Sequence, residues 1–311
     1  MKILVTGGSG QVGFELQRHL CLLGSLLAPS RKELDLADAA AVEAWLEREQ
    51  PDLIVNAAAY TAVDKAEEEP ELARQLNAEL PAQLAAYSAA RGQWLIHYST
   101  DYVYPGSGSR PWREGDPTDP PNTYGQSKLE GDLAVQQSGC RHLIFRTSWV
   151  YSARGHNFLR TMLRLGRERE SLKVVNDQVG APTPARLIAQ VTALALHRLP
   201  LAAEPEATSP PDEADRLQGL FHLAPRGETS WHGFACEIFR QAAGLGARLA
   251  LRPGTVEPIP SSAYPTPARR PLNSRLDCGA LEAALGVSLP SWQEQLALTL
   301  GELLDREATG G

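Results

Sequence analysis

Several features that mark common protein classes are missing from this sequence of 311 residues. It has four cysteines, and none forms a CxxC or Cys/His pair: Cys21, Cys140, Cys236 and Cys278. Their spacing excludes a disulfide framework and a zinc site, and favours buried thiols in a reducing compartment. No run of about 18 apolar residues is present, and Ile3 to Val5 is too short for a signal-peptide core. We therefore expect a cytoplasmic protein without a membrane partner.

A concentration of positive charge is also missing. The chain carries 30 basic and 37 acidic residues, which gives a formal charge of −7. Without a run of Lys or Arg, a nucleic-acid partner is excluded and a small ligand is favoured. An apolar content of 43% with 22% charged residues is typical of a folded globular protein. The length exceeds the about 250–300 residues at which one core stops growing, so we expect two packed units.

Short apolar runs alternate with segments of helical length, which predicts an α/β fold with a Rossmann-type, doubly wound parallel sheet. Apolar spacing predicts the main helices of the first half at 12–23, 39–49, 71–91 and 124–137. The strands are expected at Ile3–Thr6, Leu26–Pro29, Leu53–Asn56, Trp94–Ser99, Leu143–Arg146 and Lys173–Val175.

We expect residues 1–148 to form a nucleotide-binding domain. Residues 149–311 would form mainly a smaller, C-terminal substrate-binding domain, with segments near 184–198 and 219–223 returning to the first unit. The stretch 201–218 is acidic and rich in proline, so we expect a flexible loop there.

The strongest local motif is TGGSGQVG, from Thr6 to Gly13, between a predicted strand and a predicted helix. Glycines allow a tight turn and a close approach to a pyrophosphate, whose charge then lies at the helix N-terminus. The alternative is a tight turn without a ligand. The residues expected to contact a dinucleotide here are Gly7, Gly10, Gln11 and Val12.

The residues after the second predicted strand bear on the choice of cofactor. An Asp or Glu that binds the ribose of NAD is usual at this point, but Ser30 and Arg31 stand there. Arg31 can pair with a 2′-phosphate, which favours NADPH, with NADH as the alternative. Asp35 and Leu36 could flank the adenine ring, and a solvated Arg31 is the competing interpretation.

A YxxxK pair and a hydroxyl residue at a strand end form the second motif. Tyr124 and Lys128 are four residues apart on a predicted helix, so they share one face. A neighbouring ammonium and a cationic nicotinamide together would lower the pKa of the phenol toward neutrality and make it a general acid or base. Thr100 ends a predicted parallel strand, where its hydroxyl could bind a carbonyl oxygen.

Together these motifs resemble the extended short-chain dehydrogenase/reductase superfamily. Five local strings are similar to one family within it, the dTDP-4-dehydrorhamnose reductases: NAAAYTAVDKAE at 56–67, STDYVY at 99–104, TYGQSKLEGD at 123–132, RTSWVY at 146–151 and DQVGAPT at 177–183. The resemblance implies NADPH-dependent reduction of the C4 keto group of dTDP-4-dehydro-β-L-rhamnose to dTDP-L-rhamnose.

The resemblance also implies roles for individual residues. Thr100, Tyr124 and Lys128 would be the catalytic triad, with Tyr124 as the proton donor and both Tyr124 and Lys128 against the cofactor. Further cofactor contacts would come from Ala57, Ala58, Ala59 and Tyr60. The dTDP-sugar would contact Thr100, Asp101, Tyr102, Trp149, Asn157, Gln178 and Thr183.

Two other functions remain open at this stage. One is a nucleotide-sugar epimerase or dehydratase, and the other is a non-catalytic, NADP-binding regulatory subunit. The resemblance also makes Glu15 a candidate ligand for a non-catalytic Mg²⁺ at a homodimer interface, with Glu294 or Glu302 as partners. A Glu near a helix N-terminus is equally explained by the helix dipole, and no metal is expected to take part in the chemistry.

Overall fold

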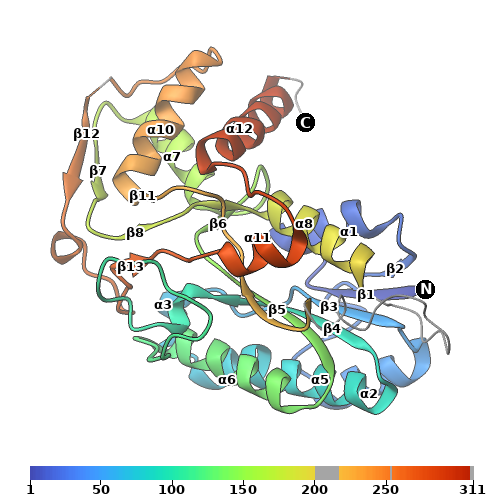
Figure 1. Ribbon diagram of the computed structural model, residues 1–311. Helices are drawn as coiled ribbons and strands as arrows, with labels where there is room; N and C mark the ends of the chain where they lie inside the picture. The colour runs from blue at the N-terminus through green and yellow to red at the C-terminus, as the bar shows by residue number, and fades with distance from the viewer. Residues whose placement is uncertain (200–216, 253, 309–311) are drawn as a thin grey trace.

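The computed structural model describes residues 1–199, 217–252 and 254–308, and its centre is one parallel sheet (Figure 1). The strand order is β10-β5-β4-β3-β1-β2. The strands are β1 (Lys2–Thr6), β2 (Ser25–Leu27), β3 (Leu53–Asn56), β4 (Trp94–Thr100), β5 (Arg141–Thr147) and β10 (Gly219–His222). All five pairings between neighbours are parallel, which confirms the predicted α/β class.

Helices cover both faces of this sheet because its strands are apolar on both sides. Ile3 and Val5 of β1 face α1 (Gln11–Leu20), α8 (Ala185–Arg198) and α11 (Gly279–Leu285). Leu4 of the same strand faces α2 (Ala39–Glu49), α5 (Leu80–Arg91) and α6 (Thr123–Gln137). Figure 1 shows these two helical layers on opposite sides of the sheet.

A second, smaller core lies beyond the carboxyl ends of the strands. It is formed by α7 (Phe158–Glu168), α10 (Trp231–Gly244) and α12 (Trp292–Ala308), packed beside the parallel pair β7 (Leu172–Val175) and β12 (Val256–Ile259). Two small sheets connect it to the rest: β11 (Thr229–Ser230), β8 (Val179–Gly180) and β13 (Asn273–Ser274) form one, and β6 (Val150–Tyr151) and β9 (Thr183–Pro184) form the other.

Two predicted elements differ from the structure. The strand predicted at Lys173–Val175 exists as β7, but it pairs with β12 and not with the central sheet, whose last strand is β10. The long helix predicted at 71–91 is interrupted: α4 (Pro70–Arg74) passes through a π-helical turn at Gln75–Glu79 into α5. Apolar periodicity does not detect such a turn because the insertion changes the register by one residue only.

The described part of the chain contains no helix that is both long and apolar enough to cross a membrane. The predicted loop at 201–218 lies outside the described residues, apart from its last two positions.

Candidate active site

The turn between β1 and α1 has a shape that only glycine allows. Gly7 has a φ of +66°, and a Cβ there would lie 2.7 Å from the carbonyl oxygen of Ala57. A Cβ on Gly13 would lie 2.2 Å from the carbonyl oxygen of Gly7. Gly10 is the N-cap of α1 and provides no side-chain acceptor, so the first N–H groups of the helix remain available to an anion. This turn therefore fits the pyrophosphate of a dinucleotide.

The segment after β2 exposes an arginine that is followed by two locally hydrogen-bonded acidic residues. The carboxylate of Glu33 accepts a hydrogen bond from the Ser30 amide at 2.8 Å, and this bond lowers the pKa of Glu33. Asp35 accepts from the Ala37 amide at 3.1 Å, while Leu36 packs on the core. Arg31 is exposed. The cation is thus free to face a ligand at this edge of the sheet, whereas both carboxylates are engaged with nearby backbone.

The segment from Ala57 to Tyr60 leaves the end of β3 beside the glycine turn. The Ala58 amide donates to the Thr6 hydroxyl at 3.2 Å. At the other end, Asn77 binds both backbone groups of Tyr60: its Oδ1 accepts from the amide at 2.8 Å, and its Nδ2 donates to the carbonyl at 3.0 Å. Asn77 lies in the π-helical turn, so sequence patterns gave no signal for this fully buried support.

Thr100 and Tyr124 meet where β4 ends and α6 begins. Asn122 caps α6 by accepting from the Gly125 amide at 2.8 Å. A Cβ at Gly125 would lie 2.2 Å from the carbonyl oxygen of Tyr102, so only glycine lets the helix start this close to the strand end. The ring of Tyr124 then meets the ring of Tyr102 edge-on at 5.5 Å between centroids, and its hydroxyl is hydrogen-bonded to Thr100.

The surroundings of the Tyr124 phenol determine its pKa. Burial raises the pKa of Tyr124, and the hydrogen bond from Thr100 opposes that rise only in part. The predicted lowering, which requires a cationic nicotinamide as well as Lys128, stays a prediction. Lys128 donates to the carbonyl oxygen of Tyr98 at 2.7 Å and lies 3.3 Å from His97 Nε2. Tyr124 keeps its proton, and this state suits a proton donor.

Lys128 is almost completely buried, with 1% of its surface exposed. Burial lowers its pKa to about 8, against an opposing attraction from Asp132. Asp132 in turn accepts from Arg146 Nε at 3.0 Å and from the Ser99 hydroxyl at 2.8 Å. Neither Asp132 nor Arg146 was predicted as a functional residue, because charged residues in a helix and in a strand are usually exposed.

Asp101 is a second buried acid beside the triad, with 1% of its surface exposed. Burial raises its pKa to about 7, while the hydroxyl groups of Ser274 and Thr100 favour the ionised form. The Thr100 hydroxyl lies 3.2 Å from Asp101 Oδ1. Asp101 therefore contacts the Thr100 hydroxyl and exposes little of its own surface to a substrate.

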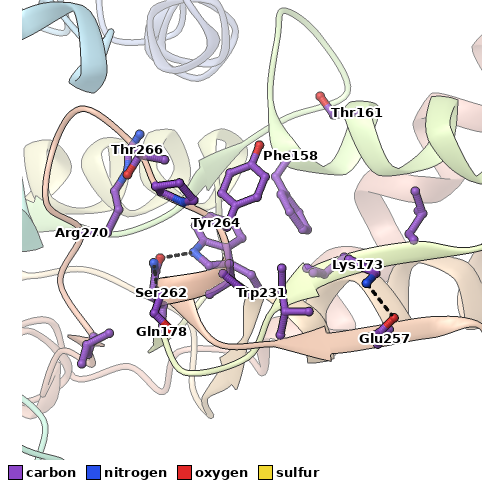
Figure 2. Close-up of a pocket in the computed structure, with 18 of the residues that line it drawn as sticks. Phe158, Thr161, Lys173, Gln178, Trp231, Glu257, Ser262, Tyr264, Thr266 and Arg270 are labelled. Atoms are coloured by element: carbon purple, nitrogen blue, oxygen red, sulfur yellow. Dashed lines mark hydrogen bonds and ion pairs between the residues drawn. The ribbon is translucent and has the colours of Figure 1, made fainter.

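A large cavity of about 1320 Å³ opens beside Tyr102 and extends into the second unit (Figure 2). Aromatic residues and polar groups share its wall, among them Phe158, Gln178, Trp231, Tyr264 and Arg270. The indole N–H of Trp231 donates to Gln178 Oε1 at 3.1 Å, and an ion pair joins Lys173 and Glu257 at 3.4 Å (Figure 2). Aromatic faces with cations suit a ligand that has rings and negative charge.

Three residues predicted to contact the sugar nucleotide have other roles in the structure. Trp149, at a φ of 50°, stacks on Trp231 with 3.8 Å between ring centroids and reaches the cavity only through it. Asn157 caps α7 through Oδ1 and donates Nδ2 to Gln11 Oε1 at 2.8 Å. Thr183 is fully buried and lies 3.2 Å from the Ala181 carbonyl. Asn157 and Thr183 do not line the cavity. Their polar groups are used in capping α7 and in a hydrogen bond within the core.

Comparison with known proteins decides the family. The model of the RmlD substrate binding domain family matches residues 1–304. The dTDP-4-dehydrorhamnose reductase of Escherichia coli is 46% identical over 312 residues, which cover 99% of this chain and 100% of that protein. The chain belongs to the dTDP-4-dehydrorhamnose reductase family.

Solved structures of this family agree with the fold described here. The dTDP-4-dehydrorhamnose reductase of Clostridium acetobutylicum has a TM-score of 0.86 at 35% identity, covering 98% of this chain and 100% of that one. The reductase of Bacillus anthracis, solved in complex with NADP, has a TM-score of 0.85 at 31% identity, covering 97% of this chain and 99% of that one.

Glu15, the candidate Mg²⁺ ligand, is paired with an arginine in this member of the dTDP-4-dehydrorhamnose reductase family. Its carboxylate lies 3.3 Å from Arg186 Nε, and Arg186 also binds Glu302. Among the described residues, no three His, Cys, Asp or Glu side chains are grouped so as to hold a metal ion. The guanidinium supplies the positive charge that the two carboxylates require, so the structure gives no support for Mg²⁺ there.

Proposed function

We propose that this chain reduces the C4 keto group of dTDP-4-dehydro-β-L-rhamnose to give dTDP-L-rhamnose, with NADPH as reductant. The observation that carries the proposal is that Thr100 ends β4 and the YxxxK pair lies on α6, next to Tyr102, which lines a cavity large enough for a nucleotide sugar. Family membership supports the substrate. The NADP complex of the Bacillus anthracis relative supports the cofactor.

The residues present fit a dinucleotide. The glycine turn would hold the pyrophosphate, because the Gly7 and Gly13 positions leave no room for a Cβ and the first N–H groups of α1 face the turn. Arg31 would pair with the 2′-phosphate of NADPH. When bound, the cofactor supplies the hydride that reduces the carbonyl carbon.

The chain's own residues supply the proton and orient the substrate carbonyl. Thr100 donates a hydrogen bond to the substrate carbonyl, and Tyr124 gives its phenolic proton to the oxygen as negative charge develops there. Burial keeps the Tyr124 phenol protonated until the transfer, because the pKa of this group is raised. The Lys128 ammonium, one helical turn away, favours the tyrosinate that remains.

The cavity determines which carbonyl compound reaches Tyr124. Tyr102 lies at the junction, since it lines the cavity and its ring contacts the ring of Tyr124. Arg270 donates to Tyr102 at 3.3 Å and to Asp64 Oδ2 at 2.7 Å, so it holds the wall at this point. Gln178 and Trp231 would contact the nucleotide sugar further along the wall.

The test is the loss of NADPH absorbance on addition of dTDP-4-dehydro-β-L-rhamnose to the purified chain. We expect turnover that depends on both compounds and yields dTDP-L-rhamnose. Absence of NADPH oxidation at high enzyme concentration would disprove the activity. A redox-neutral conversion of the nucleotide sugar would instead support the epimerase or dehydratase alternative.

A further inference from the structure

A row of buried polar side chains leads from the glycine turn to Lys128. The Thr6 hydroxyl at the end of β1 lies 2.6 Å from Asn56 Oδ1 at the end of β3. Asn56 Nδ2 lies 3.1 Å from His97 Nδ1 on β4, and His97 Nε2 lies 3.3 Å from Lys128 Nζ. All four side chains are at most 1% exposed. Water therefore does not replace any of these contacts, and each donor needs an acceptor within the protein.

The direction of donation along this row is set at its first member. Thr6 Oγ1 accepts a hydrogen bond from the Ala58 amide, so its own hydrogen points to Asn56 Oδ1. The amide of Asn56 then presents Nδ2 to His97, because the reverse orientation would leave the buried Thr6 hydroxyl hydrogen without the Asn56 acceptor. His97 Nδ1 is thus an acceptor. In a neutral imidazole the proton must lie on Nε2, which faces Lys128.

The proton on Nε2 has a consequence for Lys128. An N–H group cannot hydrogen-bond an ammonium, but it can donate to the lone pair of a neutral amine. We infer that His97 is a positioning residue for Lys128, and that the Thr6–Asn56–His97 row sets the pH at which Lys128 loses its proton. This role rests on the proposed function, in which Lys128 supports Tyr124 and the cofactor.

The pKa shifts of His97 and Lys128 agree with a hydrogen on His97 Nε2. Burial lowers the pKa of His97 well below its usual value, so the ring is neutral, and burial lowers the pKa of Lys128 to about 8. Asp132, on the same helix, acts in the opposite sense: its Oδ1 lies 3.9 Å from His97 Nε2. The ion pair between Asp132 and Arg146 of β5 weakens the attraction of Asp132 for Lys128.

The remaining charged groups around α6 have partners of their own. Tyr124 lies one turn before Lys128 and is hydrogen-bonded to Thr100, as is Asp101 of the short 3-10 helix Asp101–Val103. On α3 (Val63–Ala66), Asp64 pairs with Arg270. On α4, Arg74 pairs with Glu79 of the π-helical turn. His97 is therefore the group whose proton position can change the environment of Lys128 most directly.

The second buried histidine provides a matched control. His222 is also fully buried and neutral, since its pKa is lowered to about 4, mainly by burial. Its Nε2 lies 2.6 Å from the hydroxyl of Tyr104, which also accepts from Arg146. His222 thus belongs to the same buried region of the sheet edge, but it contacts Tyr104 and not Lys128.

The first experiment reads the proton of His97 directly in the cofactor-free protein. ¹⁵N-histidine NMR distinguishes a ring nitrogen that carries hydrogen from one that does not, and loss of the signal in His97→Gln assigns it. We expect the Nε2–H form in the native chain and the Nδ1–H form in Asn56→Asp, whose carboxylate accepts from Nδ1. An Nδ1–H form in the native chain would overturn the inference.

The second experiment measures NADPH affinity by calorimetry from pH 6 to about pH 10, around the Lys128 pKa of about 8. Affinity should fall as Lys128 loses its charge. In His97→Phe and Asn56→Asp the midpoint of this fall should move upward by about one pH unit, because neither variant presents an N–H group to Lys128. His222→Gln should keep the native midpoint. An unchanged midpoint in both folded variants would refute the inference.

The two experiments separate this inference from the proposed function. Neither uses the nucleotide sugar, so failure of the native chain to reduce it would remove the proposed activity and leave the tautomer and the pH midpoint to be judged independently. Thermal melting of each variant shows that it is folded. If Asn56→Asp fails to fold, His97→Phe and the native NMR result still decide.

Discussion

The catalytic end of the central sheet and the large cavity of the second unit are constructed differently. At the sheet edge, Thr100, Tyr124 and Lys128 lie on a strand and a helix, and hydrogen bonds to backbone and buried side chains hold them. The cavity wall comes largely from segments without long regular elements, between 169 and 178 and between 255 and 272. The difference suggests that the chemistry depends on rigid local spacing, whereas substrate choice depends on how distant segments fold against each other.

One ion pair connects the two regions. Arg270 comes from the second of these segments, and Asp64 comes from α3 beside α6; their side chains approach to 2.7 Å. Tyr102 lies within 3.3 Å of the same arginine. A change at the sheet edge should therefore affect kcat most, and a change in the cavity wall should affect KM most.

Substitution Tyr124→Phe should have the largest effect. It removes the proton donor and leaves the ring in place, so kcat should fall by about 10²–10⁴-fold, the usual scale for general acid catalysis. NADPH affinity, measured by calorimetry, should change little. Tyr87→Phe is the control, because its hydroxyl binds the Leu46 carbonyl away from the site. A native rate in Tyr124→Phe would show that another group donates the proton.

Substitution Arg31→Ala should weaken the binding of NADPH far more than that of NADH. A charge-assisted hydrogen bond contributes about 1.5–3 kcal/mol, which corresponds to about 10- to 150-fold in the dissociation constant. Dissociation constants of both cofactors, measured for the variant and for Lys32→Ala, give the comparison. Equal losses for NADPH and NADH would mean that Arg31 is structural or solvated.

Substitution Gly180→Ala should disturb the cavity wall and spare the chemistry. A Cβ there would lie 2.9 Å from Ser274 Cβ and 3.1 Å from the Trp149 ring, so Trp149 must shift against Trp231. Overpacking of this kind costs about 1–3 kcal/mol, and we expect KM for the nucleotide sugar to rise by roughly 10-fold at an almost unchanged kcat. Gly115→Ala, whose Cβ would meet open space, is the control. A fall in kcat alone would contradict the separation of the two regions.

Removal of metal should have no effect. Because Arg186 already binds Glu15 and Glu302, excess EDTA or added Mg²⁺ should leave both NADPH oxidation and sedimentation unchanged, with the chain in a monomer–dimer equilibrium of at most weak metal dependence. Complete loss of activity on chelation would show that the chemistry requires a metal. A change of mass on adding Mg²⁺ would show a bridging ion at the subunit contact.

Much of the catalytic end was predictable because its signals are local. A glycine turn between a strand and a helix, a hydroxyl at a strand end and a YxxxK pair each lie within a few residues, and parallel strands bring their carboxyl ends to one edge. In the structure Thr100 ends β4 and Tyr124 lies in the first turn of α6. The burial that raises the pKa of Tyr124 was not predictable, because it depends on tertiary packing, which residue spacing does not describe.

The sequence by itself determined the α/β class, the position of the glycine turn and the family, since these follow from hydrophobic periodicity and short motifs. The contacts between residues that are far apart in the sequence depend on the tertiary structure. Arg186 meets Glu15 across 171 residues and takes the place expected for a cation. Asn157 uses its amide to cap α7 and to bind Gln11. The proton of His97 is fixed by Thr6 through Asn56, because a buried donor must find its acceptor in the folded chain, and no spacing along the sequence specifies that acceptor.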